Sequence, residues 1–151
     1  MPIVHVECLP DEALVKLLGI TRRMVYHHAG KSRVFSRLKT VTGEVAMVDE
    51  DPGSIKTEYE TGLEFIQESF GIKLYKDERD NKVLILKIKL EDWILGACKI
   101  SNVDITRFGL PSKPHALHGV INQKLPGFEK LINHLKEKEN QSIFQLREFL
   151  R

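Results

Sequence analysis

The first half of the chain alternates short apolar runs with stretches in which apolar residues recur at helical spacing. Runs rich in β-branched residues predict strands over residues 3–6, 24–28 and 44–48. Apolar residues three and four apart predict helices over residues 10–18, 30–43 and 55–70, and each helix is expected to stop at a glycine. Strands and helices that alternate in this way are typical of a mostly parallel sheet covered by helices on both faces.

The second half predicts a hairpin followed by helices. Residues 72–75 and 83–88 flank a charged turn and are expected to form an antiparallel hairpin that extends the sheet. A helix with Trp93 as a core anchor is expected over residues 90–97, then short helical turns over 101–127, and closing helices over 128–138 and 142–150. The predicted fold is a Rossmann-like three-layer α/β sandwich with a mostly parallel central sheet over residues 1–100. A helical C-terminal extension over residues 101–151 is expected to pack on the same domain.

Length and composition narrow the class of protein. A chain of 151 residues, 42% hydrophobic and 29% charged, suits one globular domain. No apolar run approaches the roughly 18 residues of a membrane span, and the N-terminus lacks a secretory pattern, so a cytoplasmic protein without a membrane partner is expected. Cys8 and Cys98 stand far apart without nearby zinc ligands, which argues against a disulfide framework and structural zinc.

The small net charge of +2 hides an uneven distribution of charged residues. Residues 13–43 contain no acidic residue, and the basic residues among them are Lys16, Arg22, Arg23, Lys31, Arg33, Arg37 and Lys39. Acidic residues then follow at Glu44, Asp49, Glu50 and Asp51. A basic segment beside an acidic cluster suits a metal-assisted phosphate site, and a solvated helix face is the alternative. We expect Lys31, Arg33 and Arg37 to bind the phosphates of a nucleic acid.

Four carboxylates follow predicted strands. Glu7 ends the first strand, Asp49 and Asp51 end the third, and Glu91 follows the strand over 83–88. Because the carboxyl ends of parallel strands share one edge of a sheet, we expect these groups to converge there, with Glu50 pointing away. Converging carboxylates repel one another, and Mg²⁺ or Mn²⁺ relieves that repulsion. The alternative is a set of helix caps and solvated turn residues.

These residues resemble the motifs of the TOPRIM domains of topoisomerases, bacterial primases, RNA-maturation nucleases and overcoming-lysogenization-defect nucleases. The resemblance rests on Val4-His5-Val6-Glu7 followed by Asp11-Glu12, and on Val48-Asp49-Glu50-Asp51-Pro52-Gly53, which matches the DxD motif of the family. It covers roughly the first half of the chain. Looser similarity to small stand-alone TOPRIM-like proteins lies in His28-Ala29-Gly30-Lys31-Ser32 and Leu90-Glu91-Asp92-Trp93-Ile94-Leu95.

The resemblance implies a phosphoryl-transfer site with one or two metal ions. In it, Asp49 and Asp51 hold Mg²⁺, Glu91 is an additional ligand, and Glu7 is catalytic, either as a metal ligand or as a general acid or base. The chain departs from the family at Cys8, where a glycine is usual. Neither primase nor topoisomerase activity follows, because the chain has no primase zinc module and no topoisomerase domain that would supply a nucleophilic tyrosine.

Other motifs are weaker. Gly30-Lys31-Ser32 opens a helix, but Val25 stands where a P-loop requires its first glycine, so a nucleoside-triphosphate P-loop is excluded. His27 and His28 are neighbours in a predicted strand, so they face opposite ways. His115 and His118 lie three apart, and the sequence around them offers no acidic or cysteine partner for a metal site.

The sequence therefore leads to one main functional hypothesis and two alternatives. The main hypothesis is a Mg²⁺- or Mn²⁺-dependent nuclease of the TOPRIM type that acts on DNA or RNA. The first alternative is a non-catalytic module that binds metal or phosphate and works with a protein partner such as an ATPase. The second is a small-molecule phosphatase or nucleotide-binding protein that uses the same carboxylates.

Overall fold

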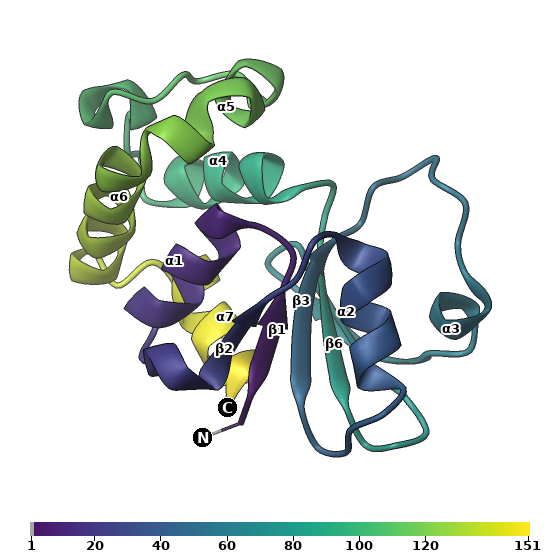
Figure 1. Cartoon of the computed structure of the whole chain (residues 1–151). Helices are drawn as coiled ribbons and strands as arrows, with labels where there is room; N and C mark the ends of the chain where they lie inside the picture. The colour runs from purple at the N-terminus through teal and green to yellow at the C-terminus, as the bar shows by residue number, and fades with distance from the viewer. Residues whose placement is uncertain (1) are drawn as a thin grey trace.

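The structure is a computed structural model that describes residues 2–151 and contains a six-stranded mixed sheet (Figure 1). The strands are β1 (Val4–Val6), β2 (Val25–His27), β3 (Val45–Asp49), β4 (Glu64–Ser69), β5 (Ile72–Lys76) and β6 (Lys82–Leu86). Their order is β2-β1-β3-β6-β5-β4. The first four strands of that order are parallel, and β5 and β4 continue the sheet with antiparallel pairings. The predicted α/β class and the predicted β5–β6 hairpin are confirmed.

Helices cover both faces of this sheet (Figure 1). The α-helices are α1 (Leu9–Leu17), α2 (Lys31–Leu38), α3 (Glu58–Thr61), α4 (Leu90–Ile100), α5 (Pro114–Val120), α6 (Leu125–Glu137) and α7 (Gln141–Leu150). Three short 3₁₀ turns are η1 (Arg22–Met24), η2 (Ile105–Phe108) and η3 (Ile121–Gln123). Helix α2 packs over β1 and β3 on one face. Helices α1, α4, α6 and α7 pack on the opposite face, where they share one buried cluster with the sheet.

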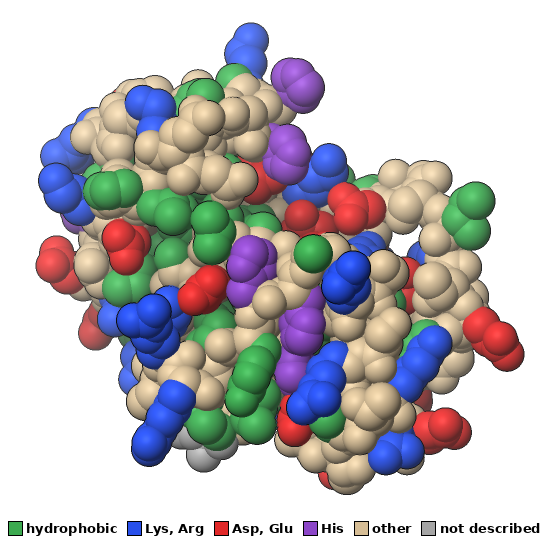
Figure 2. All heavy atoms as spheres, viewed as in Figure 1, with side chains coloured by type: hydrophobic (Ala, Val, Ile, Leu, Met, Phe, Trp, Pro, Cys, Tyr) green, Lys and Arg blue, Asp and Glu red, His purple; other side chains and the backbone are tan. Residues whose placement is uncertain are grey.

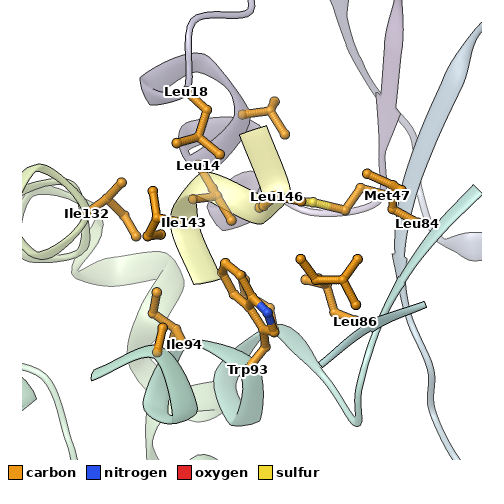
Figure 3. Close-up of a cluster of buried hydrophobic side chains, with 14 of the residues drawn as sticks. Leu14, Leu18, Met47, Leu84, Leu86, Trp93, Ile94, Ile132, Ile143 and Leu146 are labelled. Atoms are coloured by element: carbon orange, nitrogen blue, oxygen red, sulfur yellow. The ribbon is translucent and has the colours of Figure 1, made fainter. Parts of the chain in front are cut away.

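The alternation of side chains along the parallel strands explains the two hydrophobic clusters. Met47 belongs to the large cluster under α1, whereas its neighbours Ala46 and Val48 belong to the smaller cluster under α2. Figure 3 shows how the large cluster joins distant parts of the chain, with Trp93 of α4 between the sheet and the C-terminal helices. Trp93 is buried and its Nε1 donates a hydrogen bond to the Phe70 carbonyl at 2.9 Å, which confirms its prediction as a core anchor.

The helix predicted over residues 55–70 is wrong. Only Glu58–Thr61 is helical, and Gly62 is the C-cap that ends this single turn. Strand β4 follows and returns as β5 through Phe70 and Gly71, whose φ angles of 49° and 72° suit a two-residue hairpin turn. Gly71 is therefore a turn residue and not a helix stop. Apolar residues at 63, 65, 66 and 70 fit either helix or strand, and pairing with β5 decides between them.

The C-terminal third is helical, with α6 and α7 close to the two predicted closing helices, and helix α5 and the turns η2 and η3 before them. Leu131, Ile143 and Leu146 lie in the same buried cluster as Val4 and Leu14 of the sheet and α1. Lys136 of α6 donates a hydrogen bond from Nζ to the Leu17 carbonyl at 2.7 Å, which adds a polar contact to this packing. Among the helices of residues 2–151, none combines the length and hydropathy needed to cross a bilayer.

Candidate metal centre at the carboxyl edge of the sheet

The predicted carboxylates lie at the carboxyl edge of the parallel strands. Glu7 follows β1, Asp49 is the last residue of neighbouring β3, and Glu91 lies in the first turn of α4. The backbone N–H of Asp49 donates to Oε1 of Glu7 at 2.8 Å, and Oδ1 of Asp49 accepts from the Leu90 N–H at 2.9 Å. These hydrogen bonds fix two of the carboxylates relative to each other and to the start of α4.

A further carboxylate, Asp11, belongs to the same edge and was not among the predicted site residues. It lies in the first turn of α1 and is 1% exposed, and neither of its carboxylate oxygens accepts a hydrogen bond from an N–H or O–H group of residues 2–151. The neighbouring thiol of Cys8 is the one group that favours its ionised form. Burial raises the pKa of Asp11 well above its ordinary value, and the negative charges of Asp49, Glu7 and Glu91 raise it further. We call Glu7, Asp11, Asp49 and Glu91 the carboxyl-edge cluster.

Helical periodicity contains a signal for Asp11. In a helix that begins near Pro10, residue 11 shares a face with Leu14 and Val15, both of which are fully buried. Its neighbour Glu12 lies on another side and forms an ion pair with Lys16, with 2.7 Å between Oε1 and Nζ. An aspartate on the apolar face of a helix, four residues after the strand-ending Glu7, is the observation that could have identified it.

Burial and electrostatic repulsion between carboxylates raise the pKa values of Asp49 and Glu7. Burial raises the pKa of the Asp49 carboxyl to about 7, and the charges of Glu7 and Glu91 add to this effect. Burial also raises the pKa of Glu7, although the hydrogen bond from Asp49 and the positive charge of Lys31 oppose the increase. Among residues 2–151, neither Glu7, Asp11 nor Asp49 forms an ion pair with a lysine, arginine or histidine. Negative charge therefore accumulates here, and Lys31, which pairs with Asp51, acts on Glu7 only from beyond ion-pair distance.

Asp51 differs from Asp49 because it has a cationic neighbour. Its φ angle of 47° takes it out of the extended conformation, and its Oδ2 lies 3.6 Å from Nζ of Lys31. Lys31, at the start of α2, also donates to the Glu50 carbonyl at 3.3 Å. The side chain of Glu50 pairs with Lys73, with 2.6 Å between the charged atoms, so it does not join the cluster. The structure thus brings Lys31 to the DxD motif, while Arg33 and Arg37 are exposed and make no ion pair with the acidic residues of 2–151.

Glu91 is buried and has a partner that the sequence did not reveal. Nδ1 of His118, which is on α5, lies 2.8 Å from Oε1 of Glu91. The sequence near His118 offers no acidic partner, and folding supplies one from 27 positions earlier in the chain. The imidazole itself is largely exposed, so helix α5 places a histidine at the solvent side of the cluster.

The donor atoms suit a hard divalent cation, although they do not yet surround one point. Carboxylate oxygens are the ligands that Mg²⁺ and Mn²⁺ prefer, and neither oxygen of Asp11 accepts a hydrogen bond from an N–H or O–H group of residues 2–151. Within residues 2–151, however, no group of three or more Asp, Glu, His or Cys side chains is close enough to hold one ion. The side chains must turn toward one another to share a cation.

Cys8 stands beside the cluster as the N-cap of α1, and its thiol is not poised for reaction. Burial raises the pKa of this thiol, and the charge of Asp11 adds to the increase, so the protonated form dominates at neutral pH.

Comparison of the chain with family models, with curated proteins and with solved structures found no match.

Proposed function

We propose that this chain is a Mg²⁺- or Mn²⁺-dependent phosphoryl-transfer domain of the TOPRIM type, with a Rossmann-like sandwich fold, that cleaves nucleic acid. One observation carries the proposal: within residues 2–151, Glu7, Asp11 and Asp49 meet at the carboxyl edge of the parallel strands without an ion-pair partner, and neither oxygen of the buried Asp11 accepts a hydrogen bond from an N–H or O–H group. Such a cluster destabilises a protein unless a cation neutralises it. The position also matches the edge at which open α/β sheets bind ligands.

The residues of the edge have different tasks in this proposal. Asp49 and Asp11 would hold the cation, with Asp51 and Glu91 as further ligands. A bound Mg²⁺ supplies Lewis-acid polarisation of a phosphate oxygen. Glu7 carries a proton to or from the reacting water, which its raised pKa favours, while the Asp49 N–H keeps its Oε1 in place. Lys31, already next to Asp51, binds a phosphate oxygen of the substrate.

Calorimetry and thermal unfolding test the metal site directly. We expect Mg²⁺ and Mn²⁺ to bind wild type and raise its Tm, because a ligand at tenfold its Kd stabilises the folded state by about 1.4 kcal/mol. Ca²⁺ should bind without supporting cleavage. Asp49→Asn and Asp11→Asn should each weaken binding at least tenfold. Glu12→Gln is the matched control, since Glu12 lies next to Asp11 in sequence but pairs with Lys16 at the surface.

Incubation with single- and double-stranded DNA and RNA tests the reaction. We expect Mg²⁺- or Mn²⁺-dependent cleavage that Asp49→Asn and Glu7→Gln abolish while the variants remain folded. Failure of wild type to bind either metal contradicts the whole proposal. Metal binding without cleavage of any of these substrates favours instead the non-catalytic module that works with a partner such as an ATPase.

A further inference from the structure

A second surface with its own chemistry lies next to the carboxyl-edge cluster, where strand β2 forms the open edge of the sheet. It consists of Tyr26 on β2, Arg33 and Arg37 on α2, and Arg22 and Arg23 on the turn that leads into β2. We call it the β2 surface. Figure 2 shows histidine side chains in a line on this side of the molecule, with lysine and arginine side chains beside them over α2.

The arginines of the β2 surface are not engaged in ion pairs. All four are exposed, and none lies within ion-pair distance of an acidic group of residues 2–151. Arg33 and Arg37 are four residues apart on α2 and therefore project from the same side of the helix. Val34 and Leu38 turn instead toward the sheet and are fully buried. A polyanion can reach the arginines without displacing an internal partner.

Tyr26 presents an exposed aromatic ring whose orientation is fixed by its contact with His5. The tyrosine is 47% exposed, and its ring stacks on the buried His5 with 5.6 Å between ring centroids and 26° between the planes. His5 is held at both ring nitrogens, by Glu44 Oε1 at 2.6 Å from Nε2 and by His28 Nε2 at 2.9 Å from Nδ1. Because one side of the tyrosine ring lies on His5, its exposed side is available for a second planar group.

The β2 surface leads to the candidate metal centre. Tyr26 of β2 pairs with His5 of β1. Glu7 lies two residues after His5, and two residues of an extended strand span about 7 Å. Helix α2, which carries Arg37, packs over β1, the strand of His5, and the pKa of His28 is lowered by burial and by neighbouring positive charge that includes Arg37. An aromatic platform, arginines and carboxylates therefore follow one another along the edge of the molecule.

We propose that the β2 surface binds single-stranded nucleic acid, with one base stacked on Tyr26 and adjacent phosphates on Arg33 and Arg37. The inference rests on the proposed function for its substrate class and adds which form of the substrate binds. A base offers its face for stacking only when it is unpaired and unstacked, whereas a duplex encloses the faces of its bases. A fixed tyrosine ring beside unpaired arginines thus matches a single strand better than a duplex.

Fluorescence anisotropy without metal tests the proposal independently of catalysis. A labelled 15-mer single strand and a hairpin duplex of the same sequence are titrated with protein in EDTA at low salt. We expect the single strand to bind at least tenfold more tightly. Tyr26→Ala should weaken this binding about tenfold, within the 1–3 kcal/mol of one stacked base, and Tyr26→Phe should retain it. Phe65→Ala removes an aromatic ring that is 54% exposed on the opposite edge strand, and it should have no effect.

Salt dependence tests the arginines. The double variant Arg33→Ala and Arg37→Ala should reduce the slope of log affinity against log salt by about 1.4, because each phosphate contact to a single strand contributes about 0.7. The double variant Lys130→Ala and Lys138→Ala is the charge-matched control on helix α6 and its C-cap and should leave the slope unchanged. Photocrosslinking with a bromouracil-substituted strand should label the peptide that contains Tyr26, which requires no variant to fold.

Several results would overturn the inference. The inference is contradicted if the single strand and the duplex bind with equal affinity. It is also contradicted if folded Tyr26→Ala binds as wild type does, or if the crosslinks lie only in other peptides. These outcomes are separate from failure of the proposed function, which concerns metal binding and cleavage at Asp49. If wild type binds Mg²⁺ and cleaves only duplex, the proposed function stands and the single-strand inference fails. If the Tyr26 peptide crosslinks and Tyr26→Ala loses affinity, but wild type binds no metal, the β2 surface binds nucleic acid without a catalytic centre.

Discussion

The two ends of the parallel strands bury polar side chains in opposite ways. At the amino end, Asn81 is fully buried and every polar atom of its amide is used. Its Oδ1 accepts from the Glu44 N–H at 2.8 Å, and its Nδ2 donates to the carbonyls of Leu38 and Val41 and to Asp77 Oδ2. At the carboxyl end, Asp11 is buried almost as deeply, yet neither of its oxygens accepts a hydrogen bond from an N–H or O–H group of residues 2–151.

The same contrast appears in the proton affinities. Burial alone would raise the pKa of Asp77, but hydrogen bonds from Asn81, Tyr59 and Arg79 outweigh it and keep that pKa below its ordinary value. At the carboxyl end the pKa of Asp49 rises to about 7 because the hydrogen bond from the Leu90 N–H does not outweigh burial and the charges of Glu7 and Glu91. A satisfied network stabilises the fold, whereas an unsatisfied one stores unfavourable energy that a ligand can release.

The largest effect should follow from breaking the amino-end network. Asn81→Ala removes the partners of the Glu44 N–H and of two backbone carbonyls, and each buried unpaired group costs about 1–3 kcal/mol. We expect the free energy of unfolding to fall by about 3 kcal/mol or more in urea denaturation. Asn122→Ala, at an exposed position of the turn after α5, should change it by less than about 0.5 kcal/mol. A similarly small effect of both variants would show that the network does not stabilise the fold.

A smaller effect of opposite sign is expected at the carboxyl end. Asp49→Asn should raise the free energy of unfolding in EDTA at pH 8 by about 1–3 kcal/mol, because it removes a buried charge from the cluster. In wild type, the folded carboxyl has a pKa of about 7 against 3.8 when unfolded, so the folded state binds this proton more tightly. Its stabilising contribution is complete below about pH 4 and is lost as the pH rises through about 7.

Urea unfolding between pH 5 and pH 8 measures this difference. The stability of Asp49→Asn should decline less with rising pH than that of wild type, and Glu12→Gln should follow wild type. Parallel profiles for wild type and Asp49→Asn would contradict the assignment of an uncompensated charge to this edge.

The smallest effect concerns one hydrogen bond of the amino-end network. Tyr59→Phe removes the donation from the tyrosine hydroxyl to Asp77 Oδ2 at 2.7 Å but leaves the other partners of Asp77 in place. We expect a loss of about 1 kcal/mol in the free energy of unfolding. Tyr75→Phe is the matched control, since the Tyr75 hydroxyl makes no side-chain hydrogen bond within the described part of the chain. Equal losses in both variants would mean that the bond to Asp77 contributes nothing specific.

Sequence patterns predicted the parallel part of the fold because its signals are local. The apolar runs of β1 and β3 and the acidic residues that end them stand next to each other in the chain, so the edge at which Glu7 and Asp49 meet could be placed in advance. The α/β class followed from the same alternation. The metal, the substrate and the catalytic roles remain proposals, because residue types at a strand end do not specify a reaction.

The missed features depend on partners that are distant in sequence. His118 acquires an acidic neighbour only when α5 folds against α4, and no local pattern links it to Glu91. Strand β4 is decided by its pairing with β5, since its own residues fit a helix equally well. Asp11 is a different case. Its place on the apolar face of α1 could be predicted, but the packed structure decides that no N–H or O–H group of the described residues donates to its oxygens.

The mixed pairing of the sheet also has a consequence for the order in which the protein folds. Strands β4, β5 and β6 are consecutive in the chain and pair through short connections, so little loop-closure entropy is lost when they meet. Pairing of β3 with β1 requires the chain to close a loop across β2 and α2. We therefore expect the antiparallel meander to form early and the parallel half to add to it later. The carboxyl-edge cluster, which needs β1 and β3 together, would then be among the last parts of the molecule to assemble.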